Sequence, residues 1–200
     1  MDYFPLFLDL RGRRVLVVGE GEGAASRAAA VARAGAEVQL IRGFAPAMLD
    51  GAALVFVAGA QPAVAEEVAR AAAAHGVPVN VMDEPRLCSF LMPAMVERGS
   101  LVVAIGTGGA APMLARLLRQ WLDRRLPQRL GALVDLAGRY RPLVKRRLPE
   151  LGVRRRFWRR IFTGHVARLV LAGDDAGAST ALRDALGDAR HGASERDRAA

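Results

Sequence analysis

Residues 14–34 read RVLVVGEGEGAASRAAAVARA, and this stretch decides the fold. Its first part, Arg14–Val18, is a short and mostly β-branched apolar run, which predicts a strand buried in a parallel sheet. Ala24–Ala34 is rich in alanine and precedes Gly35, which predicts a helix and its end. A second strand is expected at Glu37–Ile41. Because parallel strands need such a crossover, the stretch predicts a βαβ unit.

The same alternation continues further along the chain. Leu54–Ala58 predicts a third strand and Val77–Met82 a fourth. Between them, Pro62–His75 predicts a helix with proline near its start and Gly76 just past its end. We therefore expect an α/β fold with a Rossmann-like parallel sheet over roughly the first 85 residues.

A segment that pairs two chains is expected after the sheet. Ser89–Ile105 is extended in character, and Pro112–Arg124 predicts an amphipathic helix. The apolar residues on one face of this helix are Leu114, Leu117, Leu118 and Trp121. Strand edges and apolar faces of this kind are covered when two copies associate, so we expect a homodimer formed through this segment.

The remainder of the chain is expected to be helical as far as about Ala172. From Gly173 onward the residues are small, polar and charged, which favours a flexible tail with at most one short helix. The expected divisions are a Rossmann-like domain at 1–88, a dimerisation segment at 89–126, a helical C-terminal domain at 127–172 and a flexible tail at 173–200.

The positive charge is concentrated in the second half of the chain. The net charge is +9, but residues 1–100 hold 9 Arg against 11 acidic residues, or −2. Residues 101–200 hold 20 basic and 9 acidic residues, or +11. Such segregation favours an anionic partner, which is a nucleic acid, a membrane surface or a substrate with many carboxylates.

Three features predict a cytoplasmic location without a membrane partner. The single cysteine, Cys88, excludes an internal disulfide and is typical of a reducing compartment. The first ten residues contain Asp2 and Asp9 and no basic residue, unlike a secretory signal. The longest uncharged runs are too short, and too rich in Gly and Pro, to cross a bilayer.

The glycine-rich loop matches the dinucleotide fingerprint, with Gly19, Gly21 and Ala24 in its three positions. The first glycine permits a tight turn, the second lets the backbone approach a pyrophosphate, and the helix N-terminus supplies N–H donors. Glu20 and Glu22 add negative charge where a pyrophosphate would lie. The end of the second strand offers Arg42 instead of the acid that binds a ribose. Arg42 either favours a 2′-phosphate or indicates that the cofactor site has been lost. The alternative interpretation of the whole loop is a tight βα turn that binds no ligand.

Asp83 ends the fourth strand, where open α/β sheets bind their ligands. A carboxylate at this place acts either as a general base or as the cap of a turn. The three histidines lie far apart in the sequence, and no Cys/His cluster accompanies them, so no metal site is expected.

Several longer motifs, in this order and spacing, resemble one protein family. They are DYFPLFLDL at 2–10, VLVVG at 15–19, NVMD at 80–83, SFLMPA at 89–94, GTGG at 106–109, PMLARLLR at 112–119 and RRRFW at 154–158. The family is the sirohaem synthase N-terminal module, which comprises precorrin-2 dehydrogenase and sirohydrochlorin ferrochelatase. The resemblance covers about residues 1–172.

The resemblance implies NAD-dependent oxidation of precorrin-2 to sirohydrochlorin, followed by insertion of Fe²⁺ as a substrate to give sirohaem. Its catalytic aspartate falls on Asp83. The eight carboxylates of the substrate give the arginine-rich half a purpose, because guanidinium groups bind carboxylates bidentately. The implied cofactor-binding residues are Gly19, Gly21, Glu22, Gly23 and Arg42, and the implied substrate-binding residues are Asn80, Thr107, Gly108 and Arg116.

This chain departs from the family pattern mainly on the cofactor side. Glu20 replaces a third adjacent glycine, and the interval Arg42–Ala53 is too short for the family's extra strand. Three hypotheses follow. The chain is an NAD- or NADP-dependent dehydrogenase, a chelatase or tetrapyrrole-binding protein without NAD use, or a basic nucleic-acid-binding module. The last predicts salt-dependent DNA binding, but the aromatic residues are few and no groove-reading motif is present, so no nucleic-acid partner is expected.

Overall fold

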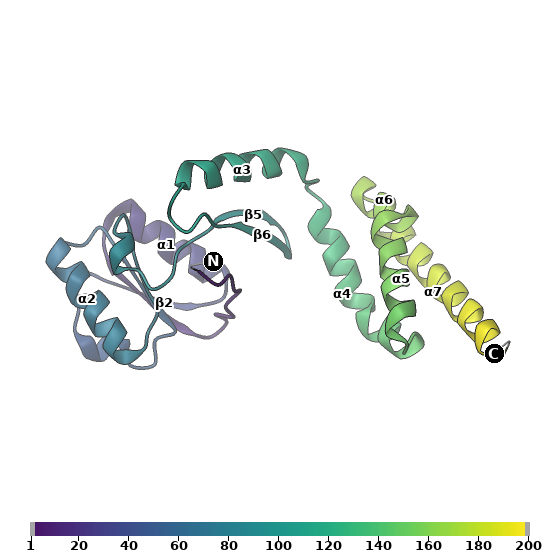
Figure 1. Ribbon diagram of the computed structural model, residues 1–200, viewed down its shortest axis with the longest axis horizontal. Coiled ribbons are helices and arrows are strands. Elements are labelled where there is room, and N and C mark those ends of the chain that lie inside the picture. Colours follow the sequence, from purple (N-terminus) through teal and green to yellow (C-terminus); the bar gives the residue numbers. More distant parts are fainter. Residues whose placement is uncertain (1–2, 199–200) are drawn as a thin grey trace. The chain divides into compact units, whose positions relative to one another are not determined.

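The strands predicted on either side of the glycine-rich loop pair into one parallel sheet (Figure 1). The computed structural model describes residues 3–198, and the side chains of residues 3–189. The chain divides into a sheet unit, residues 1–93 and 106–115, and a helical unit, residues 94–105 and 116–200. This division differs from the expected boundary at residue 88, because the chain leaves the sheet unit and then returns to it.

The sheet has four strands in the order β2-β1-β3-β4, and every neighbouring pair is parallel. The strands are β1 Arg14–Gly19, β2 Glu37–Ile41, β3 Leu54–Ala58 and β4 Val79–Val81. The strand order reverses beside β1, since the chain continues to β2 on one side of it and to β3 on the other. Ligands of open α/β sheets bind outside the carboxyl ends of the strands at such a point.

Helices α1 (Gly21–Arg33) and α2 (Pro62–His75) cover opposite faces of the sheet. Val15, Val17 and Phe56 pack with α1, whereas Leu16, Val18, Val55 and Val57 pack with α2. Residues 15–19 of β1 and all of β3 are therefore buried on both faces, which explains why each is a continuous apolar run. The predicted βαβ organisation is confirmed.

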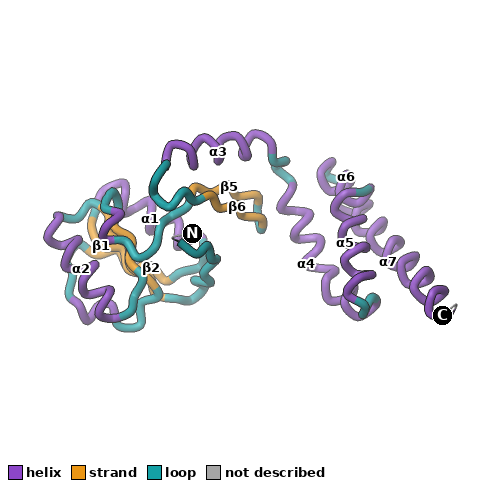
Figure 2. Tube along the Cα trace, in the orientation of Figure 1, coloured by secondary structure: helices purple, strands orange, loops and turns teal. Residues whose placement is uncertain are grey.

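Strand β2 forms one edge of the sheet. The interval that follows it contains the short 3₁₀ helix η1 (Pro46–Leu49) and no strand (Figure 2). A second 3₁₀ helix, η2 (Pro85–Leu87), follows β4. The short interval after β2 thus leaves its outer edge without a neighbouring strand among the residues that the structure describes.

The helical unit contains an antiparallel hairpin and most of the remaining helices. The elements are β5 Ala94–Arg98, β6 Leu101–Ile105, α3 Pro112–Arg125, α4 Leu130–Arg147, α5 Leu151–Thr163, α6 His165–Ala172 and α7 Asp175–Arg198. Helix α3 begins in the sheet unit and ends in the helical unit. The core of the helical unit is formed by α4 to α7, with Leu136, Phe157, Ile161 and Leu182 among its buried side chains.

The prediction of a flexible tail at 173–200 is wrong for the described part of that segment. Helix α7 buries Ala178, Leu182 and Leu186, which recur every four residues and form one apolar stripe. The carboxylate of Asp174 accepts a hydrogen bond from the N–H of Gly177 at 2.8 Å near the helix start. The small and charged residues between the stripe positions conceal this periodicity. Residues 199–200 lie outside the described residues.

A buried arginine ties the hairpin to the end of α3 within the helical unit. Arg98 is 6% exposed, and its guanidinium donates to a carboxylate oxygen of Asp123 at 2.9 Å and to the backbone carbonyls of Asp123 and Leu126 at 2.6 and 3.4 Å. These acceptors lie at the C-terminus of α3, where carbonyl groups lack helical partners. Arg98 therefore supplies hydrogen-bond donors to carbonyl groups that have no partner within the helix.

None of the helices in the described part of the chain combines the length and the apolar character needed to span a bilayer.

Candidate nucleotide-binding site

Two glycines bring the carboxyl ends of β1 and β3 together. Gly19 has φ +125°, and a Cβ added there would overlap the carbonyl oxygen of Ala58. Gly59, directly after β3, has φ +69°, and a Cβ there would overlap the carbonyl oxygen of Glu20. Glycine is the residue that tolerates this backbone conformation at no steric cost. The chain therefore needs glycine at both ends of this contact.

Gly21 begins α1 and borders open space. It has φ +80°, and a Cβ built there meets no heavy atom within 4 Å. The N-cap residue, Glu20, makes no side-chain hydrogen bond that caps the helix. The first N–H groups of a helix have no helical acceptor, and phosphate oxygens are favourable acceptors at this position. The loop and the helix start therefore fit the pyrophosphate of a dinucleotide.

The third position of the fingerprint serves packing. Ala24 is fully buried, at 0% exposure, and it belongs to the core beneath α1. A Cβ added at Gly23 would lie 3.0 Å from the sulfur of Met82, the residue before Asp83. Glycine at this position thus lets α1 lie close to the segment that follows β4. Glu22, in the first turn of α1, is exposed.

Glu20 and Arg42 form an ion pair across the loop. The Nε of Arg42 lies 3.2 Å from Oε2 of Glu20, and both side chains are largely exposed. Arg42 directly follows β2, whereas Glu20 directly follows β1. The guanidinium of Arg42 therefore pairs with the negative charge that Glu20 adds to the loop.

Asp83 lies in a tight turn after β4. The N–H of Glu84 donates to the carbonyl of Val81 at 3.3 Å, which makes Asp83 the third residue of a four-residue turn. Its φ is +63°, and it is the only residue other than glycine with a positive φ among the described residues. Turns of type II need a positive φ at this position, and Asp and Asn are among the residues that tolerate it. Such backbone strain costs about 1–3 kcal/mol and is concentrated at functional sites.

The segment after η2 clamps this turn. The thiol of Cys88 contacts the backbone N and O of Val81 at 3.1 and 3.2 Å and the carbonyl of Glu84 at 3.4 Å. The hydroxyl of Ser89 accepts from the N–H of Val79 at 2.8 Å. Sequence reasoning missed both residues as supports of the site, and only their short separation from Asp83 hinted at this role.

Asn80 belongs to the same clamp. It is 6% exposed, and its amide donates to the carbonyl of Phe90 at 3.0 Å. The amide nitrogen thus has an internal acceptor, and substrate binding by Asn80 stays a prediction. Asn80 positions the segment that supports Asp83.

A small pocket of ≈ 210 Å³ lies beside Asp83 in the sheet unit. It is lined by residues 57–60 at the end of β3, by Pro62, Ala65 and Glu66 of α2, and by residues 81–84, Arg86 and Leu87. The guanidinium of Arg86 donates to Glu84 at 3.0 Å and lies 3.6 Å from Glu66. These two carboxylates, Glu84 first, raise the pKa of Arg86, and its guanidinium balances part of their negative charge in the pocket wall.

The three remaining predicted residues, Thr107, Gly108 and Arg116, lie in the loop before α3 or in α3 itself. Thr107 accepts a hydrogen bond through Oγ1 from the N–H of Ala111 at 3.3 Å, just before α3. Gly108 is exposed and has φ +62°. Both belong to the sheet unit, whereas Arg116 is exposed on the part of α3 that belongs to the helical unit. The structure thus brings together Gly19, Gly21, Gly23 and the Asp83 turn at the carboxyl edge of the sheet.

No group of three or more His, Cys, Asp or Glu side chains that could hold a metal ion comes together within the described residues.

Comparisons with known proteins identify two regions of the chain. The family model described as “Putative NAD(P)-binding” matches residues 6–94, and “Sirohaem synthase dimerisation region” matches residues 129–186. The second match covers α4 to α6 and part of α7. It lies C-terminal to residues 89–126, the segment for which the sequence predicts pairing.

Individual relatives agree with these matches. A sirohaem synthase of Azotobacter vinelandii is 41% identical over 210 residues, covering 94% of this chain and 45% of that protein. A sirohaem synthase of Pseudomonas aeruginosa is 42% identical over 207 residues, covering 93% of this chain and 44% of that protein. The chain thus spans less than half the length of these curated relatives.

A solved structure shows the same fold. “SirC, precorrin-2 dehydrogenase” superposes with a TM-score of 0.68 at 19% sequence identity, covering 91% of this chain and 100% of that chain. This likeness shows the fold. The two family models and the relatives at 41–42% identity make the chain similar to sirohaem synthases over 93–94% of its length, with an NAD(P)-binding match at residues 6–94 and a dimerisation-region match at residues 129–186.

Proposed function

We propose that the chain oxidises precorrin-2 to sirohydrochlorin with a nicotinamide dinucleotide and then inserts Fe²⁺ to give sirohaem. The observation that carries this proposal is the open space at Gly21 and the start of α1, which we call the cradle. Gly23 of the same helix lies close to Met82, which precedes Asp83 in its strained turn. The names of the relatives and the NAD(P)-binding family model support the same assignment.

The residues of the chain have separate roles in this proposal. Gly19 and Gly21 shape the loop, and the first N–H groups of α1 bind the pyrophosphate. When bound, the nicotinamide supplies the hydride acceptor. Asp83 takes the proton that the tetrapyrrole loses with the hydride. Metal insertion also releases protons, from two pyrrole N–H groups, and in this proposal Asp83 accepts these in turn.

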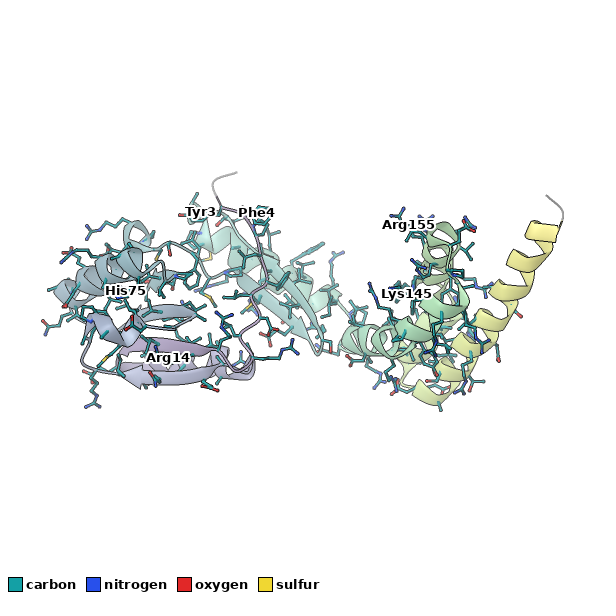
Figure 3. The ribbon with its side chains drawn as sticks, turned by 90° about the horizontal axis from the view of Figure 1, so that it is seen from below. Tyr3, Phe4, Arg14, His75, Lys145 and Arg155 are labelled. Atoms are coloured by element: carbon teal, nitrogen blue, oxygen red, sulfur yellow. The ribbon has the colours of Figure 1, made fainter. Side chains whose placement is uncertain are left out.

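The exposed basic side chains of the helical unit support a polyanionic substrate. Lys145 on α4 and Arg155 on α5, labelled in Figure 3, are both exposed. Guanidinium groups pair with carboxylates bidentately, which fits the carboxylates of precorrin-2. We place the enzyme in the cytoplasm, since its single cysteine is a free thiol.

The proposal predicts oxidation that depends on the dinucleotide. The purified chain is incubated with precorrin-2 and either NAD⁺ or NADP⁺, and the absorbance spectrum is followed before and after addition of Fe²⁺. We expect the spectrum of sirohydrochlorin first and that of sirohaem second. If the chain inserts Fe²⁺ into added sirohydrochlorin but shows no oxidation with either dinucleotide, it is a chelatase and not a dehydrogenase. Absence of both reactions would refute the proposal.

We further predict that the chain is a homodimer in which α3 lies in the interface. The side chains of Leu114, Leu117, Leu118 and Trp121 are between 41% and 54% exposed, and they repeat with the helical period. Sedimentation at micromolar concentration is expected to show a dimer, and Leu117→Glu is expected to separate it, because a carboxylate would be buried on association. Arg124→Gln, at an exposed position of the same helix, is the control. A dimer that survives Leu117→Glu would move the interface away from α3, to a surface such as that of α4 to α7, and a wild-type monomer would contradict the homodimer itself.

A further inference from the structure

We propose that Glu20 is the residue that recognises the adenosine ribose and that it makes this site selective for NAD⁺ over NADP⁺. This inference rests on the proposed function and deepens it. In dinucleotide-binding folds an acidic residue about 20 residues after the glycine loop binds the ribose 2′-hydroxyl. This chain has Arg42 at that place, directly after β2, so the sequence offers no acid there.

The ion pair brings a carboxylate from the glycine loop to the end of β2. Glu20 follows β1, the neighbour of β2 in the sheet, and its Oε2 lies 3.2 Å from Nε of Arg42. The acid therefore comes from the glycine loop and Arg42 holds it. An acid thus stands in the glycine loop, and a guanidinium stands at the end of β2, where the acid is usual.

The backbone of Glu20 is fixed for this task. Its conformation is extended, with φ −151° and ψ 179°, between the two glycines of the fingerprint. Gly59 allows the β3 turn to contact its carbonyl oxygen. Its side chain makes no cap hydrogen bond, and Arg42 is its one ion-pair partner among the described side chains. The second carboxylate oxygen is thus available to a ribose hydroxyl.

Charge decides between the two dinucleotides. The Glu20–Arg42 pair is neutral as a whole, so it offers no net attraction to a 2′-phosphate. A phosphate would meet the carboxylate as a like charge, and Arg42 could bind it only after leaving Glu20. A ribose hydroxyl donates to the carboxylate without any rearrangement. The side chain of Arg42 is 84% exposed and that of Glu20 is 63% exposed. Such an exposed ion pair contributes little to stability, so its role is to position the carboxylate of Glu20.

The experiment measures the dissociation constants of NAD⁺ and NADP⁺ for the full chain by titration calorimetry. We expect the wild type to bind NAD⁺ at least about tenfold more tightly than NADP⁺. Glu20→Gln removes a charge-assisted hydrogen bond, so NAD⁺ is expected to bind about tenfold more weakly. Because this variant also releases Arg42, NADP⁺ is expected to bind more tightly than it does to the wild type.

Two further variants sharpen the result. Arg42→Gln is expected to weaken NAD⁺ binding a few-fold without any gain for NADP⁺, since the acid loses its support. Glu37→Gln makes the same chemical change at an exposed carboxylate at the other end of β2, and it is expected to leave both constants unchanged. Matching thermal melting curves of all variants confirm that each one is folded.

Two outcomes overturn the inference while the proposed function stands. Tighter binding of NADP⁺ by the wild type would make Arg42, and not Glu20, the selecting residue. Unchanged NAD⁺ affinity in Glu20→Gln would show that the carboxylate does not contact the ribose. Binding of neither dinucleotide by the wild type would refute this inference and the dehydrogenase assignment together.

Discussion

Asp83→Asn is expected to lower the rate of precorrin-2 oxidation by about 10²–10⁴-fold, the usual effect of losing a general base. Asparagine keeps the shape of the side chain and its hydrogen bonding, and it also tolerates the positive φ of +63° at this position. The fold is therefore expected to remain intact, and the rate is expected to fall because asparagine cannot accept the proton. Stopped or continuous absorbance assays of oxidation and of Fe²⁺ insertion measure the rates, and thermal melting measures the stability.

Two companion variants separate chemistry from backbone strain at the same turn. Asp83→Ala is expected to lose the activity and also about 1–2 kcal/mol of stability, because alanine is disfavoured in the left-handed region. Glu67→Gln, at an exposed carboxylate on α2, is the control for a change of charge and is expected to be silent. Wild-type rates of oxidation and of metal insertion in Asp83→Asn would show that Asp83 only shapes the turn.

Gly19→Ala is expected to unfold the sheet unit, with a loss of more than about 4 kcal/mol, which is exceptional for one methyl group. The added Cβ would overlap the carbonyl oxygen of Ala58, and the left-handed φ of +125° adds strain. Relief requires β1 to move away from β3, and both strands lie at the centre of the sheet. Urea unfolding followed by circular dichroism measures the loss.

Gly21→Ala is the matched control for this prediction. It introduces the same methyl group, also at a positive φ, here +80°, but into open space, so the cost is expected to be only about 1–2 kcal/mol. The methyl group would occupy the cradle, and the variant is therefore expected to be folded and to bind dinucleotides weakly. Equal stability of the two variants would contradict the close contact between the ends of β1 and β3.

The sheet could be predicted from the sequence because its two inner strands are buried on both faces. Residues 15–18 and 54–58 are continuous apolar runs, and Gly19 and Gly76 mark a turn and a helix end where the structure needs a positive φ. Asp83 could be named as a candidate for the same reason, since it directly follows a predicted strand. Local chemistry and tertiary structure agree at all these positions.

The features that could not be predicted depend on which strand ends become neighbours. Glu20 and Arg42 are 22 positions apart, and the sequence analysis treats the acid in the loop and the arginine after β2 as separate features. The β1–β2 pairing places the two side chains in contact. The hydrogen bond from Asn80 to the carbonyl of Phe90 also cannot be seen in a motif, because it joins two segments that the fold brings together. Helix α7 was missed because its stripe of Ala178, Leu182 and Leu186 is diluted by glycine and charged residues.

The way in which the hairpin joins the rest of the chain has a consequence for protein engineering. Ala94 and Ile105 are register partners at the open end of the β5–β6 hairpin, so the chain leaves and re-enters the sheet unit at neighbouring points. The hairpin is thus an insertion whose two ends can be joined by a short turn. A single continuous polypeptide of residues 1–93 and 106–115 then corresponds to the sheet unit alone, whereas truncation at residue 93 would discard part of it.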